Sequence, residues 1–138
     1  MTRTGVQPAW EKIVDIGFSN YSLLTRDQRV WFNIETLTTG GLWDHYVNSG
    51  ADKNSDTIDD LEYLNFSHIA NVLRDFNKKY FPKGVPIGPD EREIYLECAD
   101  EDQLGDDIEK MDEDFWMLSE ELENALLEHI NKTGIGKE

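Results

Sequence analysis

The chain has 138 residues, of which 29 are acidic and 13 are basic, so its formal net charge is −16 at pH 7. Seventeen of the acidic residues lie between Asp90 and Glu128, where the only bases are Arg92 and Lys110. This segment therefore carries −15 of the net charge. Nucleic acids and anionic lipid surfaces both attract basic patches, so the composition argues against direct nucleic-acid binding and against membrane binding. It indicates a positively charged partner instead.

The apolar content predicts a single domain over residues 1–138 that includes the acidic third. Hydrophobic residues make up 38% of the chain and aromatic residues 11%, which is enough for one core. Tyr95 and Phe115 continue the aromatic content into the acidic segment, which argues against disorder there. We expect no membrane span, because the chain has no run of about 18 apolar residues, and no signal peptide, because residues 1–10 have no basic start followed by an apolar run. The single Cys98 favours a reducing compartment such as the cytoplasm.

Helix signals begin early in the neutral part of the chain, residues 8–81. A first helix is predicted from Pro8 to about Gly17, because proline fits the first turn of a helix. Thr25 is followed three residues later by Gln28, which is the pattern of a capping box. This pair predicts the start of a second helix.

The second helix is expected to stop at the glycine pair Gly40 and Gly41, with a short helical turn over residues 42–47. A third helix is predicted to start within residues 54–57, where Asn, Ser or Asp would cap it. The long central helix would have Ser67 as its cap and would end before Pro82.

Residues 82–89 contain three prolines and two glycines, which predicts a connector loop. The acidic helical part, residues 90–132, is too small for a core of its own and must pack against the preceding helices. Its clearest helix is predicted to begin with Ser119 as cap and to end before Gly134. No segment alternates at the period of a strand, so the predicted fold class is all-α: a single compact multi-helix domain with an acidic C-terminal third.

Several aromatic residues have the helical spacing of buried positions: Trp31, Tyr63, Phe76 and Trp116. Trp43 and Tyr46 lie in the segment after the glycine pair. We expect them either to pack this turn against the core or to contribute to a homodimer surface.

Short motifs follow one another in a fixed order through most of the chain. They are residues 24–30, the pair Gly40 and Gly41 followed by Asn48 and Ser49, the helix end at Pro82, and residues 108–116 with Phe115. In this order and spacing the chain resembles the domain of unknown function 4375 family over roughly residues 20–131. The resemblance implies a mostly helical fold, in which these motif residues have structural roles.

The same family includes a bacterial DNA-mimic protein, whose carboxylates are displayed like phosphates and bind a dimeric helix-turn-helix regulator. The resemblance and the charge together predict a non-enzymatic protein that covers the DNA-binding face of a basic regulator. The predicted partner-binding residues are Asp100, Glu101, Asp102, Asp106, Asp107, Glu109, Asp112, Glu113, Asp114, Glu120 and Glu121.

Carboxylate density fits this hypothesis. If residues 90–128 were all helical, they would span about 58 Å and present one carboxylate per roughly 3.4 Å, which is similar to one DNA strand. Two alternatives stay open. The same surface would suit an acidic immunity protein that neutralises a basic toxin, and an acidic run is also typical of a face that is merely solvated.

Calcium binding and catalysis find less support. Asp52, Asn54 and Asp56 match the first ligand positions of an EF-hand loop, but Thr57 and Tyr63 stand where the loop needs Gly and Glu. None of the three histidines belongs to a known catalytic motif, and the sequence has no glycine-rich loop of the kind that binds phosphate. We therefore predict no catalytic residue, no metal site and no cofactor.

Overall fold

The computed structural model describes residues 3–137, and within this range the fold is all-α, as predicted. Four short 3-10 turns are described: η1 (Arg3–Val6) precedes the first helix, η2 (Tyr21–Leu23) and η3 (Ser49–Lys53) connect helices, and η4 (Ile135–Lys137) follows the last helix. The helices are α1 (Gln7–Ser19), α2 (Arg26–Val47), α3 (Asn54–Tyr63), α4 (Ser67–Tyr80), α5 (Pro89–Glu97) and α6 (Glu101–Thr133).

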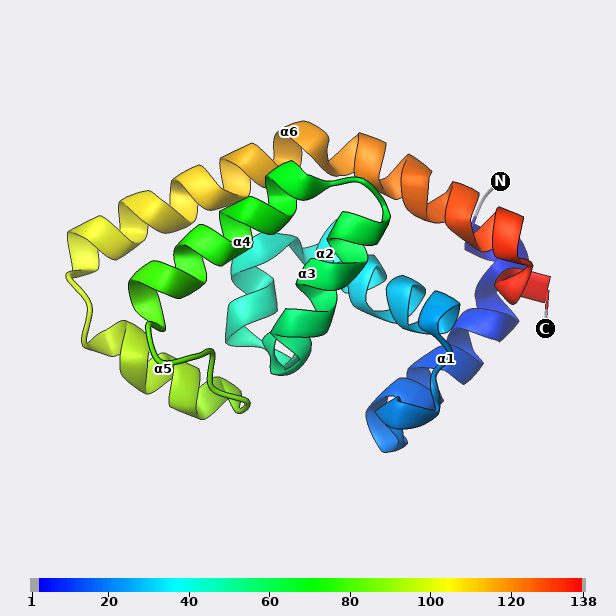
Figure 1. The fold of residues 1–138 in the computed structure, drawn as a ribbon, viewed down its shortest axis with the longest axis horizontal. Helices are drawn as coiled ribbons and strands as arrows, with labels where there is room; N and C mark the ends of the chain where they lie inside the picture. Colours follow the sequence, from blue (N-terminus) through cyan, green and yellow to red (C-terminus); the bar gives the residue numbers. More distant parts are fainter. Residues whose placement is uncertain (1–2, 138) are drawn as a thin grey trace.

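The long helix α6 arches over the whole length of the molecule (Figure 1). Helix α4 runs below it, α5 lies at the end where α6 begins, and α1 lies at the other end together with both chain termini. Helix α2 is the central element, because it contacts α6, α3, α1, α5 and the η3 turn. The acidic third of the chain therefore packs along the neutral part and shares its core.

The core forms where α2, α4 and α6 meet. Helix α2 contributes Trp31 and Ile34, which are fully buried, and α4 contributes Leu73. Helix α6 contributes a stripe whose members are mostly three, four or seven residues apart, which places them on one helix face. The buried members of this stripe are Met111, Phe115, Leu122, Leu126, His129 and Ile130.

The predicted helix start at Ser119 is wrong, because α6 is one continuous helix of 33 residues. Its N-cap is Asp100, whose side chain accepts a hydrogen bond from the backbone N–H of Gln103 at 2.9 Å. Ser119 lies inside the helix, where its hydroxyl donates to the carbonyl of Trp116 instead of capping. The helix ends as predicted at Gly134, which has a left-handed backbone with φ of 74°.

The capping box of Thr25 and Gln28 is confirmed, with hydrogen bonds of 3.2 and 3.0 Å. The caps predicted for the next two helices are wrong. Helix α3 follows the η3 turn directly and has no side-chain cap, because Asn54 already belongs to the helix and bonds elsewhere. Ser67 is the first residue of α4 and makes no capping hydrogen bond.

Two of the predicted buried aromatic residues are half exposed. Trp31 and Phe76 are buried, as expected. Tyr63 is 47% exposed and Trp116 is 48% exposed, although Tyr63 keeps an edge contact with the ring of His129 and Trp116 with the ring of Phe115. Tyr46 is fully buried in the core, so its role is packing of the turn and not display on a surface.

A network of buried polar side chains joins α2, α3 and α4. Asn77 donates to the side-chain oxygen of Asn54 at 2.7 Å and accepts from the hydroxyl of Tyr46. The amide nitrogen of Asn54 therefore donates to Nε2 of His45, at 2.9 Å. His45 is buried and must be neutral to accept this bond. Burial, together with the nearby positive charge of Arg92, lowers the pKa of His45 to about 3.

This pKa predicts an acid-sensitive contribution to stability. The usual histidine pKa is 6.5, so between pH 6.5 and about 3 the unfolded chain binds a proton that the folded chain does not. The stability is fully present above pH 6.5 and falls with pH by up to about 1.4 kcal/mol per unit. We expect His45→Gln to lose less free energy of unfolding than the wild type between pH 7 and 4.5, measured by urea denaturation. The exposed His68→Gln should follow the wild type; identical losses in all three proteins would contradict the prediction.

The predicted helix stop at the glycine pair is confirmed as a break inside α2. Gly41 has φ of 83° and ψ of −178°, and the helical turn over residues 42–47 restarts after it. A Cβ atom at Gly41 would lie 2.9 Å from Cζ2 of Trp116 on α6. Both the backbone angle and this close approach therefore require glycine.

A pair of alanine substitutions tests this requirement. Gly41→Ala should lower the free energy of unfolding by about 1–3 kcal/mol, because it strains the backbone and pushes against Trp116. Gly105→Ala, on the open surface of α6 with nothing within 4 Å, should instead raise it by up to about 1 kcal/mol. Urea denaturation measures both, and a neutral Gly41→Ala would show that the break is not needed.

Candidate protein-binding surface

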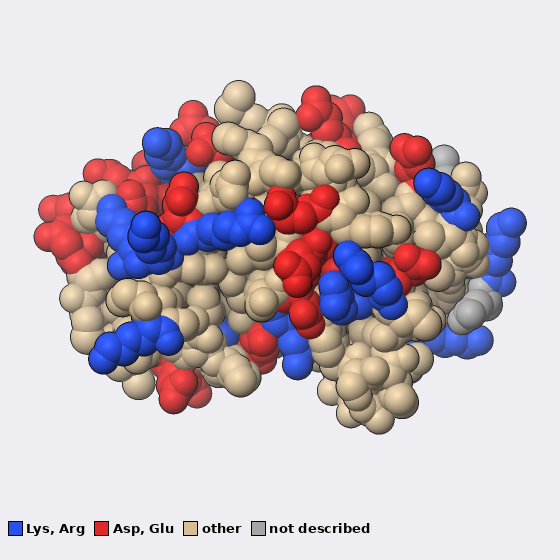
Figure 2. Space-filling view, viewed as in Figure 1, with Lys and Arg blue, Asp and Glu red and all other residues tan. Residues whose placement is uncertain are grey.

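The face of α6 opposite the core carries a line of exposed carboxylates, which we call the outer row. Successive members are separated by four, three, four and seven residues, which keeps them on one helix face. Among the side chains that the structure describes, no Lys or Arg lies within ion-pair distance of any of them. The members are Asp102, Asp106, Glu109, Glu113 and Glu120. Figure 2 shows acidic side chains gathered over the first half of α6, with Lys and Arg lying over α4 below.

The displayed charge is less dense than the sequence suggested. Residues 90–128 are not one helix, since α5 ends at Glu97 and α6 begins at Glu101. From Asp100 to Glu128, a rise of about 42 Å, nine of thirteen acidic residues are exposed. This gives one exposed carboxylate per about 5 Å, compared with one phosphate per about 3.4 Å along a DNA strand. The spacing is near that of a single strand and sparser than that of the duplex.

Asp107 faces the body of the protein and is partly buried. Its carboxylate pairs with Lys79 at 2.6 Å and accepts hydrogen bonds from Tyr80 and from Gln103. The bond from Lys79 is the main reason why the pKa of Asp107 lies below its usual value. Asp107 thus ties α6 to α4, and its charge is already compensated.

Asp112 has a structural role in the break of α2. After Gly41, the backbone N–H groups of Leu42 and Trp43 have no helical acceptor. The Oδ1 atom of Asp112 accepts from both, at 3.0 Å each. A carboxylate of α6 therefore caps the second half of α2 from 70 residues away.

The other predicted partner-binding residues divide as follows. Asp100, Glu101 and Glu121 are exposed, and Asp114 is partly buried. Asp100 also caps α6, while Glu101 lies on the side that faces α5. The structure therefore brings only some of the predicted partner-binding residues onto one surface. The outer row is the largest group of them that shares one helix face.

The residues of the short motifs described above lie at several places in the fold. Gly40 precedes the break, and the side chain of Asn48 donates to Asp44 at 2.6 Å at the end of the helix. The side chain of Ser49 lies outside the described part of the structure. Pro82 follows the last turn of α4, and Phe115 is fully buried against the core.

Sequence reasoning missed the role of Arg92, a lone base among the acids of α5. Its side chain is fully buried and holds together three segments. It pairs with Asp52 at 2.9 Å and donates four further bonds to backbone oxygens. These acceptors are Tyr46 (2.8 Å), Asn48 (2.5 Å), Pro86 (2.8 Å) and Ile87 (2.9 Å). The sequence did contain a signal for this role: a single Arg follows a proline-rich loop, whose backbone carbonyls need hydrogen-bond donors from elsewhere.

The residues that resemble an EF-hand loop have other partners. Asp52 pairs with Arg92, Asn54 belongs to the buried network, and Asp56 accepts from the hydroxyl of Tyr21 at 2.9 Å. Within residues 3–137, no cluster of three or more His, Cys, Asp or Glu side chains could hold a metal ion.

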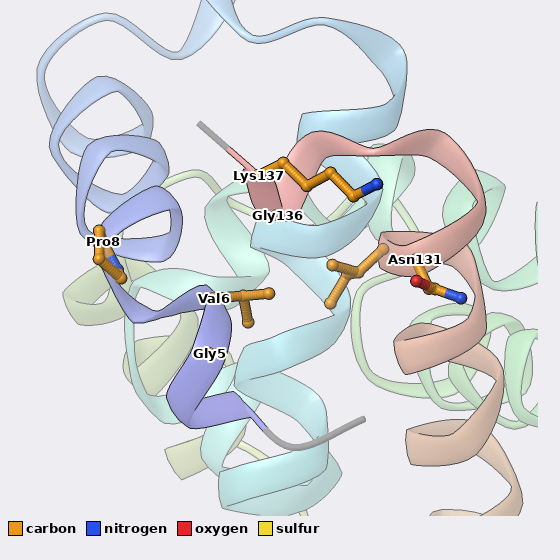
Figure 3. Close-up of a pocket in the computed structure, with 7 residues that line it drawn as sticks. Gly5, Val6, Pro8, Asn131, Gly136 and Lys137 are labelled. Carbon is orange, nitrogen blue, oxygen red and sulfur yellow. The ribbon is translucent and has the colours of Figure 1, made fainter.

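A pocket of about 340 Å³ lies where the two ends of the chain meet. Figure 3 shows Val6 of η1 directed toward Gly136 of η4, with Asn131 and Lys137 at the margin. A Cβ atom at Gly136 would lie 2.5 Å from a methyl group of Val6. The lining residues offer one cation and no pair of a nucleophile with a base, so this pocket is a packing contact between the termini.

The family model described as DMP19-like protein matches residues 22–133, which includes α2 to α6 with the outer row. The chain belongs to the DMP19-like protein family. The match agrees closely with residues 20–131 expected from the sequence motifs. No curated protein and no solved structure matches the chain. In the described part of this family member, no helix has the length and apolar character needed to cross a membrane.

Neighbouring carboxylates of α6 should respond differently to truncation. Asp112→Ala should lower the free energy of unfolding by about 1–2 kcal/mol, because two backbone N–H groups lose their acceptor. Glu113→Ala, which removes an exposed member of the outer row, should change it by less than about 0.5 kcal/mol. Urea denaturation of both variants measures the difference. Equal effects would show that Asp112 is not a cap.

Proposed function

We propose that this protein binds a basic DNA-binding protein through the outer row and so prevents that protein from binding DNA. The observation that carries the proposal is the separation of α6 into a buried apolar stripe and an exposed row of unpaired carboxylates. Membership of the DMP19-like protein family supports it, since the family resemblance includes a DNA mimic. The protein would act by covering a surface, without catalysis.

Electrostatics would dominate the encounter. The DNA-binding face of a regulator is lined with Lys and Arg that normally meet phosphates. A rigid helix with many exposed carboxylates attracts such a face over a distance, speeds association and loses this advantage at high salt. Asp107 and Asp112 would contribute little to the contact, because their charges serve internal bonds.

The length of the outer row suggests how much of the partner one molecule covers. Asp102 and Glu120 are 18 residues apart, or about 27 Å along the helix. The two half-sites read by a dimeric helix-turn-helix regulator are about 34–36 Å apart. One outer row would therefore cover the reading head of one subunit of such a dimer.

An affinity capture from the lysate of the source cell tests the proposal. The bait would be the wild type or an outer-row variant with Asp102→Asn, Asp106→Asn, Glu109→Gln and Glu113→Gln. We expect the wild type to retain a DNA-binding protein at low salt and to release it at about 0.5 M salt, where the Debye length is near 4 Å. The outer-row variant should retain little of it.

The matched control carries the same change in net charge at exposed acids that do not belong to α6. It combines Glu11→Gln, Asp15→Asn, Asp59→Asn and Asp75→Asn. This control should capture the partner as the wild type does, and the captured protein should lose its DNA in a competition assay. Capture of a basic toxin would favour a neutralising role outside transcription. Equal behaviour of the two variants would reduce the outer row to a solvated face.

A further inference from the structure

A second surface feature lies beside the start of the outer row. It is a groove of about 550 Å³ between the second half of α2, helix α5 and the first turn of α6. Its floor is apolar and is formed mainly by Trp43, Val47, Leu96 and Leu104. Val47 is 43% exposed, so part of this apolar floor is open to solvent. A cavity of this size matches those that hold a small ligand or a large side chain.

The groove has an acidic rim. Asp90, Glu93 and Glu97 follow each other by three and four residues on α5, and Glu101 closes the rim from α6. All four side chains are exposed, and no Lys or Arg lines the groove. The one base of α5, Arg92, is buried behind the groove and pairs with Asp52, so it does not neutralise the rim.

We propose that this groove binds a basic amphipathic segment of the partner, with an apolar side chain on the floor and Lys or Arg against the rim. This inference rests on the proposed function, because it names a second contact with the same basic partner. The charge complementarity selects the occupant. A segment of acidic or neutral surface would leave four carboxylates without partners, and a second copy of this chain would bring a net charge of −16.

The geometry suits a helical segment. The three carboxylates on α5 extend over seven residues, or about 10 Å, which is about two turns of a helix. Lys or Arg residues three or four positions apart on the partner would reach them, while an apolar residue between these bases would enter the groove. Glu101 of the rim and Asp102 of the outer row are adjacent in the chain, so one partner would contact both surfaces.

The groove would supply an apolar contact, which the outer row lacks. Salt screens contacts between exposed charges, but apolar burial persists when salt is added. DNA offers a basic protein phosphates but no apolar groove beside them. An anchor in the groove would therefore let the protein distinguish its partner from other basic proteins that bind carboxylates equally well.

Two fluorescein-labelled peptides of about 15 residues test the groove directly. The first has Lys on one helical face and Leu on the other, and the second has Ser in place of each Leu. Fluorescence anisotropy measures their binding at low and high salt. We expect both peptides to bind at low salt, and we expect only the Leu peptide to keep substantial affinity at high salt.

Two variants block the floor without removing an acidic residue. Ala99→Trp fills the groove from the turn between α5 and α6, and Val47→Asp makes its floor polar. Each should weaken the Leu peptide at high salt by about tenfold or more. Val47→Asp adds a negative charge, so purely electrostatic binding would become tighter instead. Thermal unfolding confirms that each variant is folded, and either one alone is sufficient for the test.

The outer-row variant separates the two surfaces, because it should weaken both peptides at low salt and leave the Leu preference intact. Equal binding of the Leu and Ser peptides at every salt concentration would overturn the groove proposal. So would dimer formation that Ala99→Trp abolishes, since a second copy would then be the occupant. If Ala99→Trp blocks the peptide but wild type captures no DNA-binding protein, the groove stands and the proposed function fails.

Discussion

The buried guanidinium of Arg92 is the contact on which the arrangement of this molecule depends. It joins the loop before α5 to the end of α2 and the η3 turn, whose bonded residues precede Arg92 by 46 and 40 positions in the chain. A buried charge is tolerated only when it is paired and hydrogen bonded, and here one carboxylate and four carbonyls meet this need. Because Arg92 is buried and paired inside the protein, all the exposed charged side chains of α5 are acidic. The same interaction therefore positions the groove and sets the sign of its rim.

The acidic residues include two groups: some are bonded inside the protein, and those of the outer row are exposed. Asp60 is fully buried, pairs with Arg29 at 2.6 Å and accepts from Asn33, while Asp107 and Asp112 bind α4 and α2 to α6. These carboxylates are compensated by cations or by backbone N–H groups. The outer row has no such partner among the described residues, so its charges act outward. The net charge of −16 thus overstates the charge that the surface of α6 displays, and it does not show how regularly the exposed carboxylates are placed.

Local signals allowed much of the fold to be predicted. The capping box at Thr25, the break at Gly41 and the stop at Gly134 each depend on residues within a few positions, and each is observed. The cap on the second half of α2 was not predictable in this way, because its acceptor Asp112 is distant in sequence. The same holds for Arg92, whose partners lie on three segments. The helices predicted to begin near Asn54 and Ser67 do begin there, but neither residue is a side-chain cap, because each is already the first residue of its helix.

The sequence predicted that the candidate surface is acidic, but it did not predict which carboxylates share one face of α6. Splitting α6 at Ser119 concealed the apolar stripe that runs from Met111 to Ile130, and without that stripe the outward face of the helix could not be assigned. The uninterrupted course of α6 also limits how its sequence can change. Each residue turns the helix by about 100°, so inserting one residue near Gly105 would move Asp102 away from the line of Glu109, Glu113 and Glu120. Substitutions can thus change the charge of the outer row one residue at a time, whereas an insertion or deletion would move its members onto different faces of the helix.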